Sequence, residues 1–577
     1  MADGFQRLLA ERDLPAVMSL NVQAAMGPVR EPQRGQLSLL VRHFLERFFN
    51  HETASPDGDS KTRLVQLAFA AGLPGFIVAI YLWPLYHPVI VYPPHPGVVP
   101  GPPPYWVQMN HHFFFVLFSF IALGLITVFE WDLFFPDLLD VFVLGTLPLA
   151  QRRVFMGRVA AIAILIGAFL FDANFLAPLV LPAATDPPNL FRFLAGHLAA
   201  VTAAGLFAAI CIIAAQSALL AVLGERLFRK VSLLLQGAAV TIFVILLLLF
   251  PVLSGITPDL LKSGNPSVLW FPPYWFLGLD QRLLDGPTAL PVFGQLARIG
   301  LSALIAASAL AILAYPLAYL RRVKQLLEGA PPRGNRNHMV APLNGLLHMT
   351  AARRPLRRAV FHFINQTLLR VPRYRIYLVL YGGVGLSVLA ATLLRLTVSH
   401  GQLRAEASAD GIRMAAGIVA FWVVVGLRTA FVSSGNQRGS WIFRFTHGKP
   451  ACFDAAIDEF SAARIWILLC SLAITLSTIA LLRLVSPAEL LTWPATAAQL
   501  LVGAGASLVL TDAAFANVLM IPFTGEASAN KPNLAFTLLK FFTFFPVVTL
   551  AALLSEQWIE ISWVHFGIAA LALLVVH

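Results

Sequence analysis

Charged residues are scarce in this chain, where they make up 12% of 577 residues. Soluble globular proteins carry about 25%, so the composition excludes a cytosolic enzyme and a disordered protein. Cysteine is rarer still: Cys211, Cys452 and Cys470 each lie in or beside an apolar stretch, which excludes a disulfide framework and a cysteine-ligated metal site. Hydrophobic residues make up 58% of the chain. This balance predicts a protein that crosses a membrane several times.

Several enzyme signatures are also missing. The chain has no G-x-x-x-x-G-K-[ST] phosphate loop, no H-E-x-x-H and no G-x-S-x-G nucleophile elbow. His111 and His112 are adjacent, and neighbouring positions on a helix point about 100° apart, so an interfacial pair fits them better than a metal site. We therefore expect no catalytic residue, no metal and no cofactor in this chain.

Long apolar runs account for most of the sequence. A bilayer core needs about 20 apolar residues per helix, and none of the first 60 residues forms the hydrophobic region of a signal peptide. We therefore expect the first span to act as an uncleaved insertion signal. About twelve spans are predicted, near 64–84, 110–130, 159–181, 195–222, 231–254, 297–320, 376–396, 412–432, 464–485, 497–521, 536–554 and 560–577.

Lys and Arg are concentrated in alternate loops of this topology. The outer loop 83–109 has none and the outer loop 255–296 has only Lys262 and Arg282. This asymmetry follows the positive-inside rule and predicts that both termini are cytoplasmic. The net charge of +12 is thus explained by topology, and nucleic acid is not expected as a partner. The inner segments, which hold 31 of the 41 basic residues, are 1–63, 131–158, 223–230, 321–375, 433–464 and 522–535.

The spans form two sets of six. The predicted fold is an all-α polytopic membrane protein with a first six-helix half at 64–320 and a second at 376–577. A basic cytoplasmic linker, 321–375, joins them, and a cytoplasmic segment, 1–63, precedes them. Within that segment, residues 37–49 place Leu40, Phe44 and Phe48 at helical spacing. This pattern favours an amphipathic interfacial helix over a helix packed on cytoplasmic loops.

The predicted inner loop after the second span is rich in local structural signals. Pro136 can start a short helix, and Asp137 would lie in its first turn, where the helix dipole favours an acid. Pro148 would end that helix, and Arg152 and Arg153 lie where the next span begins. We expect a short helix across the cytoplasmic mouth, suited to receiving force from a soluble partner.

Charged residues inside the predicted spans are few. Asp512 and Lys540 lie on neighbouring spans and are expected to pair as a structural salt bridge. An ion relay would need more such groups along a path.

Aromatic residues cluster in the outer loop 255–296. They form either an interface belt or an outer gate, since irregular backbone is tolerated where protein or a water cavity covers it. The residues are Trp270, Tyr274, Trp275 and Phe276.

These features resemble the permease subunits of ABC exporters of the ABC-2 type. The inner loop carries the family pattern on Asp137, Asp140, Leu144, Pro148, Leu149 and Phe155. Gln236 follows a short basic loop at the start of the fifth span, and residues 272–276 read Pro-Pro-Tyr-Trp-Phe. The second half has Asn-Gln-Arg-Gly-Ser-Trp-Ile-Phe-Arg at 436–444, with an insertion before Trp441 that departs from the family element.

The resemblance implies a multi-pass permease of the bacterial inner membrane, in contact with membrane lipids, that exports a hydrophobic solute, lipid or peptide. A separate soluble ABC ATPase subunit would hydrolyse ATP, so the chain itself is not expected to be an enzyme. The ATPase would contact 132–153 and 433–450. Trp441 and Phe443 would be apolar anchors and Arg444 would pair with an acid on the ATPase; the alternative places these aromatics in the interface belt.

Two other classes of function are kept open. An ion-coupled secondary transporter could also have two six-helix halves, but the loop after its second span would carry a Gly-x-x-x-Asp-Arg-x-Gly-Arg-like element, which is missing. A non-transporting scaffold, or an enzyme acting on lipid-linked substrates, is the third option. Such an enzyme would need clustered Asp, His or Arg residues at one membrane interface. Asp132, Asp137 and Asp140 come nearest to such a cluster.

Overall fold

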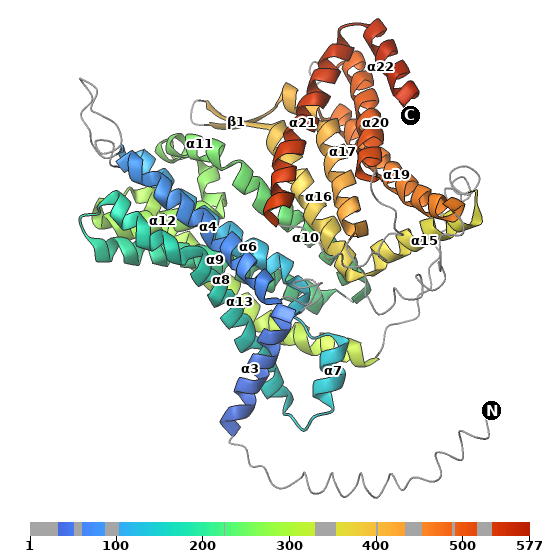
Figure 1. The fold of residues 1–577 in the computed structure, drawn as a ribbon. Helices are drawn as coiled ribbons and strands as arrows, with labels where there is room; N and C mark the ends of the chain where they lie inside the picture. The colour runs from blue at the N-terminus through green and yellow to red at the C-terminus, as the bar shows by residue number, and fades with distance from the viewer. Residues whose placement is uncertain are drawn as a thin grey trace, which may run out of the picture.

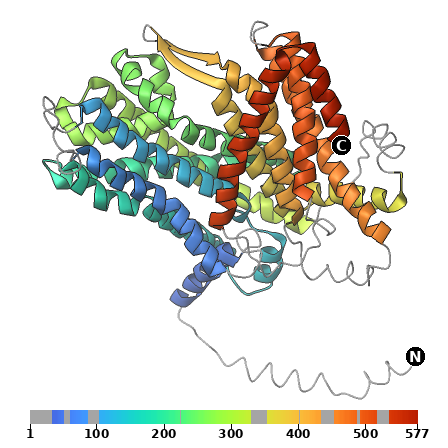
Figure 2. The same cartoon turned by 45° about the horizontal axis from the view of Figure 1, so that its top comes forward.

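The computed structural model describes residues 33–50, 60–86, 103–223, 225–328, 353–399, 402–432, 453–486, 491–515 and 534–576. Within these ranges the chain is almost entirely helical, and the helices form two groups that lie side by side (Figures 1 and 2). The first group comprises α3 (Gln33–Asn50), α4 (Ser60–Tyr86), α6 (Tyr105–Phe129), α7 (Leu138–Gly145), α8 (Gln151–Thr185), α9 (Leu190–Val222), α10 (Glu225–Leu248), α11 (Phe250–Lys262), α12 (Pro272–Asp285) and α13 (Pro291–Glu328).

The second group begins within the predicted linker and includes one hairpin. Its strands pair antiparallel, with Leu394 opposite Ala407 and Ser399 opposite Gln402. The elements are α15 (Pro355–Arg370), α16 (Pro372–Leu393), β1 (Leu394–Ser399), β2 (Gln402–Ala407), α17 (Ala409–Val432), α19 (Phe453–Val485), α20 (Trp493–Phe515), α21 (Leu534–Glu560) and α22 (Trp563–Val576).

All twelve predicted spans overlap helices, but the fifth, 231–254, is divided at Leu249 between α10 and α11, and residues 516–521 of the tenth lie outside the described residues. Among the described residues, eight helices are long and apolar enough to cross a membrane, and three shorter apolar helices accompany them. The chain is therefore a predominantly helical multi-pass membrane protein; the count of twelve and the cytoplasmic termini stay predictions. The end of the seventh span is also corrected: α16 ends at Leu393 rather than near 396, because the chain turns into β1 at Leu394.

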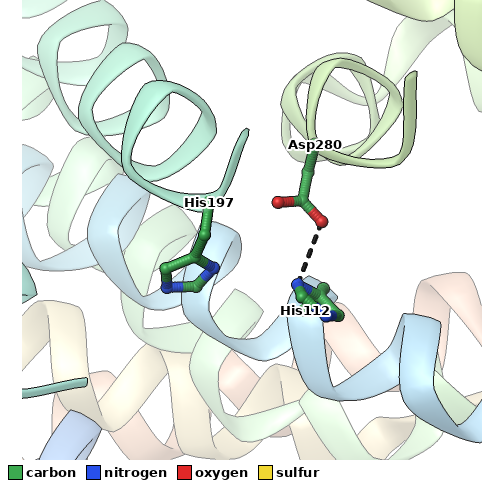
Figure 3. Close-up of side chains that lie close together, drawn as sticks. All are labelled: His112, His197 and Asp280. Carbon is green, nitrogen blue, oxygen red and sulfur yellow. Dashed lines mark ion pairs between the residues drawn. The ribbon is translucent and has the colours of Figure 1, made fainter. Parts of the chain in front are cut away.

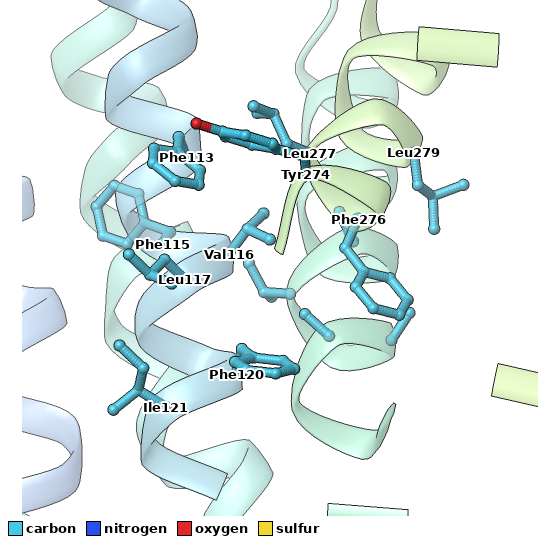
Figure 4. Close-up of a cluster of buried hydrophobic side chains, with 14 of the residues drawn as sticks. Phe113, Phe115, Val116, Leu117, Phe120, Ile121, Tyr274, Phe276, Leu277 and Leu279 are labelled. Carbon is cyan, nitrogen blue, oxygen red and sulfur yellow. The ribbon is translucent and has the colours of Figure 1, made fainter. Parts of the chain in front are cut away.

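Helix α6 lies at the centre of the first group. Its apolar side chains are buried on several faces, and those of Phe113, Val116 and Phe120 pack toward α12 and α9 (Figure 4). Gly124 permits the close approach of α10, because a Cβ there would lie 2.2 Å from Cζ of Phe243. The sequence between the fifth and sixth spans folds back into this core as α12, which packs against α6, α9 and α13.

The two groups meet where α10 packs against α16. Small residues allow this contact, since a Cβ on Gly383 would lie 2.7 Å from Cγ1 of Val240. The Ser387 hydroxyl donates to the carbonyl oxygen of Thr241 across the interface at 3.0 Å. Interhelical contacts of small and hydroxyl residues are a usual way to join membrane helices.

The amphipathic helix predicted at 37–49 is α3. Its stripe of Leu40, Phe44 and Phe48 is buried in a cluster shared with α8. The stripe that the sequence assigned to the membrane interface is therefore covered by protein. Gly157 brings the two helices together, since a Cβ on it would lie 2.9 Å from Cβ of Leu40.

Candidate functional site

The short helix expected in the inner loop is α7, and its N-terminus is fixed by local chemistry. Asp137 is the N-cap: its side chain accepts from the Asp140 backbone N–H at 2.9 Å, and the Asp140 side chain accepts in return from the Asp137 N–H at 3.4 Å. This reciprocal capping box satisfies two backbone donors that a helix end leaves open. The acids at 137 and 140 therefore set where α7 begins.

A buried ionic network holds α7 against the rest of the first group. Arg158 on α8 donates to Asp140 at 2.8 Å and to the carbonyl oxygens of Leu133 and Phe135 at 2.8 and 2.7 Å. Arg47 on α3 pairs with both Asp137 and Asp140. Because Arg158 and Asp140 are both buried, removing one partner would leave a charge unpaired in the interior, which is costly.

The outer face of α7 is apolar and uncovered. Leu139 is 69% exposed and Phe142 is 58% exposed, with Leu138 and Val143 beside them. Helix α7 projects at the end of the first group where α3 also lies (Figure 1). An apolar face held by a buried ionic anchor is a surface suited to contact with another protein.

The remaining predicted residues of this loop lie next to α7. Pro148 is exposed in the connection between α7 and α8, and Arg152 is exposed in the first turn of α8. Arg153 instead turns toward α3 and donates to the Gln36 side chain at 2.5 Å. The structure thus brings Asp137, Asp140 and Arg153 into contact with α3, a partner that the sequence analysis did not assign to them.

Glu130 lies directly after α6, beside this network. Its Oε2 is buried and has no hydrogen-bond partner among the described residues. Burial raises the pKa of the Glu130 carboxyl from its ordinary 4.5 to about 7. The carboxyl borders a small cavity lined by Leu123, Thr127, Phe134 and Phe169, so this end of the bundle contains a group that titrates near neutrality.

A second cluster of ionisable side chains is buried near the opposite end of α6. His112 of α6, His197 of α9 and Asp280 of α12 converge there, as Figure 3 shows. His112 Nδ1 lies 3.1 Å from Asp280 Oδ2, and one ligand atom from each residue lies within 4.8 Å of the others. All three side chains are buried. Three side chains that can each bind a metal ion or a proton thus meet inside an apolar core.

Aromatic rings and a polar chain surround this cluster. Phe193 lies edge-on to His112 and Phe115 edge-on to His197, with ring centroids 5.4 Å apart in each case. On the other side, the Gln281 amide donates to Asp280 at 3.1 Å. Tyr105 in turn donates to Gln281 at 3.1 Å. These hydrogen bonds lead from the buried carboxylate to the exposed end of α6.

The outer aromatic residues separate into two roles. Trp270 is 85% exposed, as an interface belt residue would be, whereas Tyr274 and Phe276 are buried in the core beside α6. The Tyr274 hydroxyl lies 2.7 Å from the Thr257 hydroxyl, and Trp275 donates its ring N–H to the Leu269 carbonyl at 2.8 Å. Tyr274 and Phe276 therefore hold α12 in place, which neither the belt nor the gate interpretation anticipated.

The predicted sites of the second half are only partly described. Asp512 pairs with Arg464 on α19, and the Lys540 side chain lies outside the described residues, so its pairing with Asp512 stays a prediction. Trp441, Phe443 and Arg444 also lie outside the described residues.

The sequence did not indicate His197 and Asp280 of the buried cluster or Arg47 and Arg158 of the ionic network. His112 was assigned to an interfacial pair with His111, which is wrong because its side chain is buried against Asp280. His197 and Asp280 lie 85 and 168 positions from His112, and no local spacing relates them. Arg47 and Arg158 read as ordinary basic residues of inner segments. One signal was available: a charged or imidazole side chain beside an apolar helical run, which applies to His197 and Arg158. No family model, curated protein or solved structure matches the chain.

Proposed function

We propose that the chain is the membrane-spanning permease subunit of an exporter that is driven by a separate soluble ATPase. The observation that carries this proposal is α7: a short helix with an exposed apolar face whose base is fixed by Arg158, Asp140 and Arg47. The α7 end of the bundle faces the cytoplasm in this proposal. The proposed cargo is a hydrophobic solute, lipid or peptide of the bacterial inner membrane.

The contacts of α7 suit the transmission of force. Arg158 connects α7 to α8, and Arg47 connects it to α3. Tyr315 on α13 donates to the Phe134 carbonyl at 2.7 Å in the segment just before α7. A displacement of α7 is therefore passed to α8 and α13 through buried polar contacts, and to α3 through a partly buried ion pair. Buried polar networks whose members are satisfied make a structure rigid.

A phosphate loop is missing from the sequence, so the energy of ATP must come from a partner in this proposal. Helix α7 has only eight residues, whereas a stable interface buries about 1,600 Å² in total. The proposed docking surface therefore also includes 433–450, the second predicted contact segment, with Trp441, Phe443 and Arg444.

Site-specific photocrosslinking tests this docking. A photoreactive amino acid replaces Phe142 in the full chain, expressed in the cells that naturally contain it, and a matched control replaces Ile312, which is 72% exposed in the middle of α13. We expect the Phe142 position to capture a soluble protein with a phosphate loop and the Ile312 position to capture lipid. Capture of no soluble protein at Phe142, or of the same proteins at both positions, would contradict the proposal.

An ion-coupled carrier is the second candidate, because ionisable groups are buried more often than the sequence suggested. His112, His197 and Asp280 share one buried cluster, and Glu556 on α21 is fully buried with neither carboxyl oxygen hydrogen-bonded in the described structure. Transport in proteoliposomes separates the two. Transport that collapses with a protonophore and needs no ATP would favour the carrier.

The third option, an enzyme acting on lipid-linked substrates, gains no support from Asp137 and Asp140, and the Asp132 side chain lies outside the described residues. Asp137 and Asp140 are already used by the helix cap and by Arg47 and Arg158.

A further inference from the structure

The buried cluster of His112, His197 and Asp280 has no role in docking at α7. We propose that these three side chains form a binding site for one divalent transition-metal ion of the zinc class. The ligands come from three different helices, α6, α9 and α12. The site stands apart from the proposed ATPase contact, so the test of one does not decide the other.

The spacing of the three side chains fits a shared ion. Zinc binds His nitrogen at about 2.0–2.1 Å and carboxylate oxygen at about 2.0–2.2 Å, so two ligand atoms of a tetrahedral site lie about 3.4 Å apart. His112 Nδ1 and Asp280 Oδ2 are already 3.1 Å apart. All three ligand atoms lie within 4.8 Å of one another, so a small inward movement of His197 completes the set.

The hydrogen bonds of the cluster are incomplete without an ion. His197 Nδ1 and Asp280 Oδ1 are buried with no hydrogen-bond partner among the described residues, and His112 Nδ1 has only Asp280 Oδ2, at 3.1 Å, as a polar neighbour. A protonated His112 could neutralise Asp280, but it would leave the Asp280 Oδ1 and the His197 nitrogen unpartnered. Buried polar atoms of this kind are costly. A divalent cation would satisfy the carboxylate and both imidazoles together.

A second layer of contacts orients the proposed ligands. Gln281 donates to Asp280 Oδ2 at 3.1 Å and accepts from Tyr105 at 3.1 Å. Metal-binding residues commonly depend on such outer hydrogen bonds for their orientation. The rings of Phe193 and Phe115 cover the imidazoles, which limits access of bulk water. The hydrogen bonds through Gln281 and Tyr105 give a polar route between the site and the surface.

The ligand types select the class of ion. Two imidazoles and one carboxylate suit Zn²⁺, Co²⁺ or Fe²⁺, whereas Mg²⁺ and Ca²⁺ prefer sites built from oxygen alone. Three protein ligands leave one position of a tetrahedral zinc site for water or a donor group of a solute. Bound in this way, the ion would tie α12 to α6 and α9.

Cobalt titration of the purified full-length chain tests the site. The chain is treated with a chelator, and Co²⁺ is added while visible absorption is recorded, because tetrahedral Co²⁺ absorbs far more strongly than the hydrated ion. We expect about one equivalent to bind per chain. His197→Gln and Asp280→Asn should lose this signal. His111→Gln should keep it, because His111 adjoins the cluster but contacts Tyr86 at 3.0 Å instead.

Absorption spectroscopy at the zinc K-edge on the wild-type chain provides a measurement that does not depend on folding of the variants. We expect a first shell of nitrogen and oxygen only, with the outer scattering of two imidazole rings. Absence of bound metal in the wild-type chain would overturn the proposal. So would a shell containing sulfur, or Co²⁺ binding that persists in folded His197→Gln and Asp280→Asn.

Discussion

Replacement of Arg158 by Met should loosen α7 while leaving most of the bundle intact. The change removes the Arg158 contacts to Asp140, Leu133 and Phe135, which are 2.8, 2.8 and 2.7 Å long. Breaking a buried ion pair costs about 3–5 kcal/mol. Asp140 keeps its contact to Arg47, so we expect the lower end of that range, about 3 kcal/mol.

Hydrogen exchange of the chain in detergent measures this loss where it occurs. A loss of about 3 kcal/mol corresponds to roughly a hundredfold lower protection of the amides in α7. Arg42→Met is a matched control, because Arg42 forms an exposed pair with Glu46 on α3, and exposed pairs contribute little. We expect the control to leave α7 protection unchanged.

The double variant Arg158→Met with Asp140→Asn tests whether the pair itself is responsible. Removing both charges avoids a buried carboxylate that has lost one of its two arginine partners, and replacing both partners of a buried pair is often close to neutral. Asparagine also keeps a side-chain oxygen for the helix cap. We expect the double variant to regain part of the lost protection. Unchanged protection in Arg158→Met, or a double variant that loses the sum of the two single losses, would show that this ion pair does not hold α7.

Three further predictions concern other parts of the molecule. The pKa of Glu130 rises from 4.5 to about 7 on folding, so the folded state is favoured at low pH and loses about 3 kcal/mol of stability as the pH rises from 4.5 to 7. Glu130→Gln should therefore flatten the dependence of unfolding temperature on pH, and an unchanged slope would contradict this assignment. Gly278→Ala should lower the unfolding temperature through an overpacking cost of about 1–3 kcal/mol, because its Cβ would lie 2.9 Å from the backbone oxygen of Phe293; an unaltered melting curve would show that α12 can move aside. Asp512→Asn should cost less than about 1 kcal/mol in denaturant unfolding, since its pair with Arg464 is partly exposed; a larger loss would indicate a buried role.

Local patterns in the sequence predicted the helices well. Apolar runs of about 20 residues specify membrane helices because the bilayer leaves backbone groups few other partners. The short helix after the second span was predictable from Pro136 and Asp137, but its bounds were not: Asp137 is the N-cap rather than a first-turn residue, and α7 ends at Gly145, before Pro148. These signals operate within a few residues and need no knowledge of the tertiary structure.

The contacts that position α7 and α12 could not be predicted in this way. Arg47 meets Asp137 across 90 positions, and Asp280 meets His112 across 168. Their proximity depends on how α3, α6, α8 and α12 pack, and no periodic pattern in a single sequence indicates that packing. The same holds for α3, whose apolar stripe fits a membrane surface and the face of α8 equally well.

Purification of the intact complex from cells that naturally contain the chain tests the docking of an ATPase on α7 most directly. We expect the wild-type chain, extracted in mild detergent, to retain a soluble subunit that hydrolyses ATP. The double variant Leu139→Asp with Phe142→Asp should lose this subunit while the chain stays folded. The contradicting result is a folded wild-type chain with no ATP-hydrolysing subunit, or a double variant that retains the subunit in full.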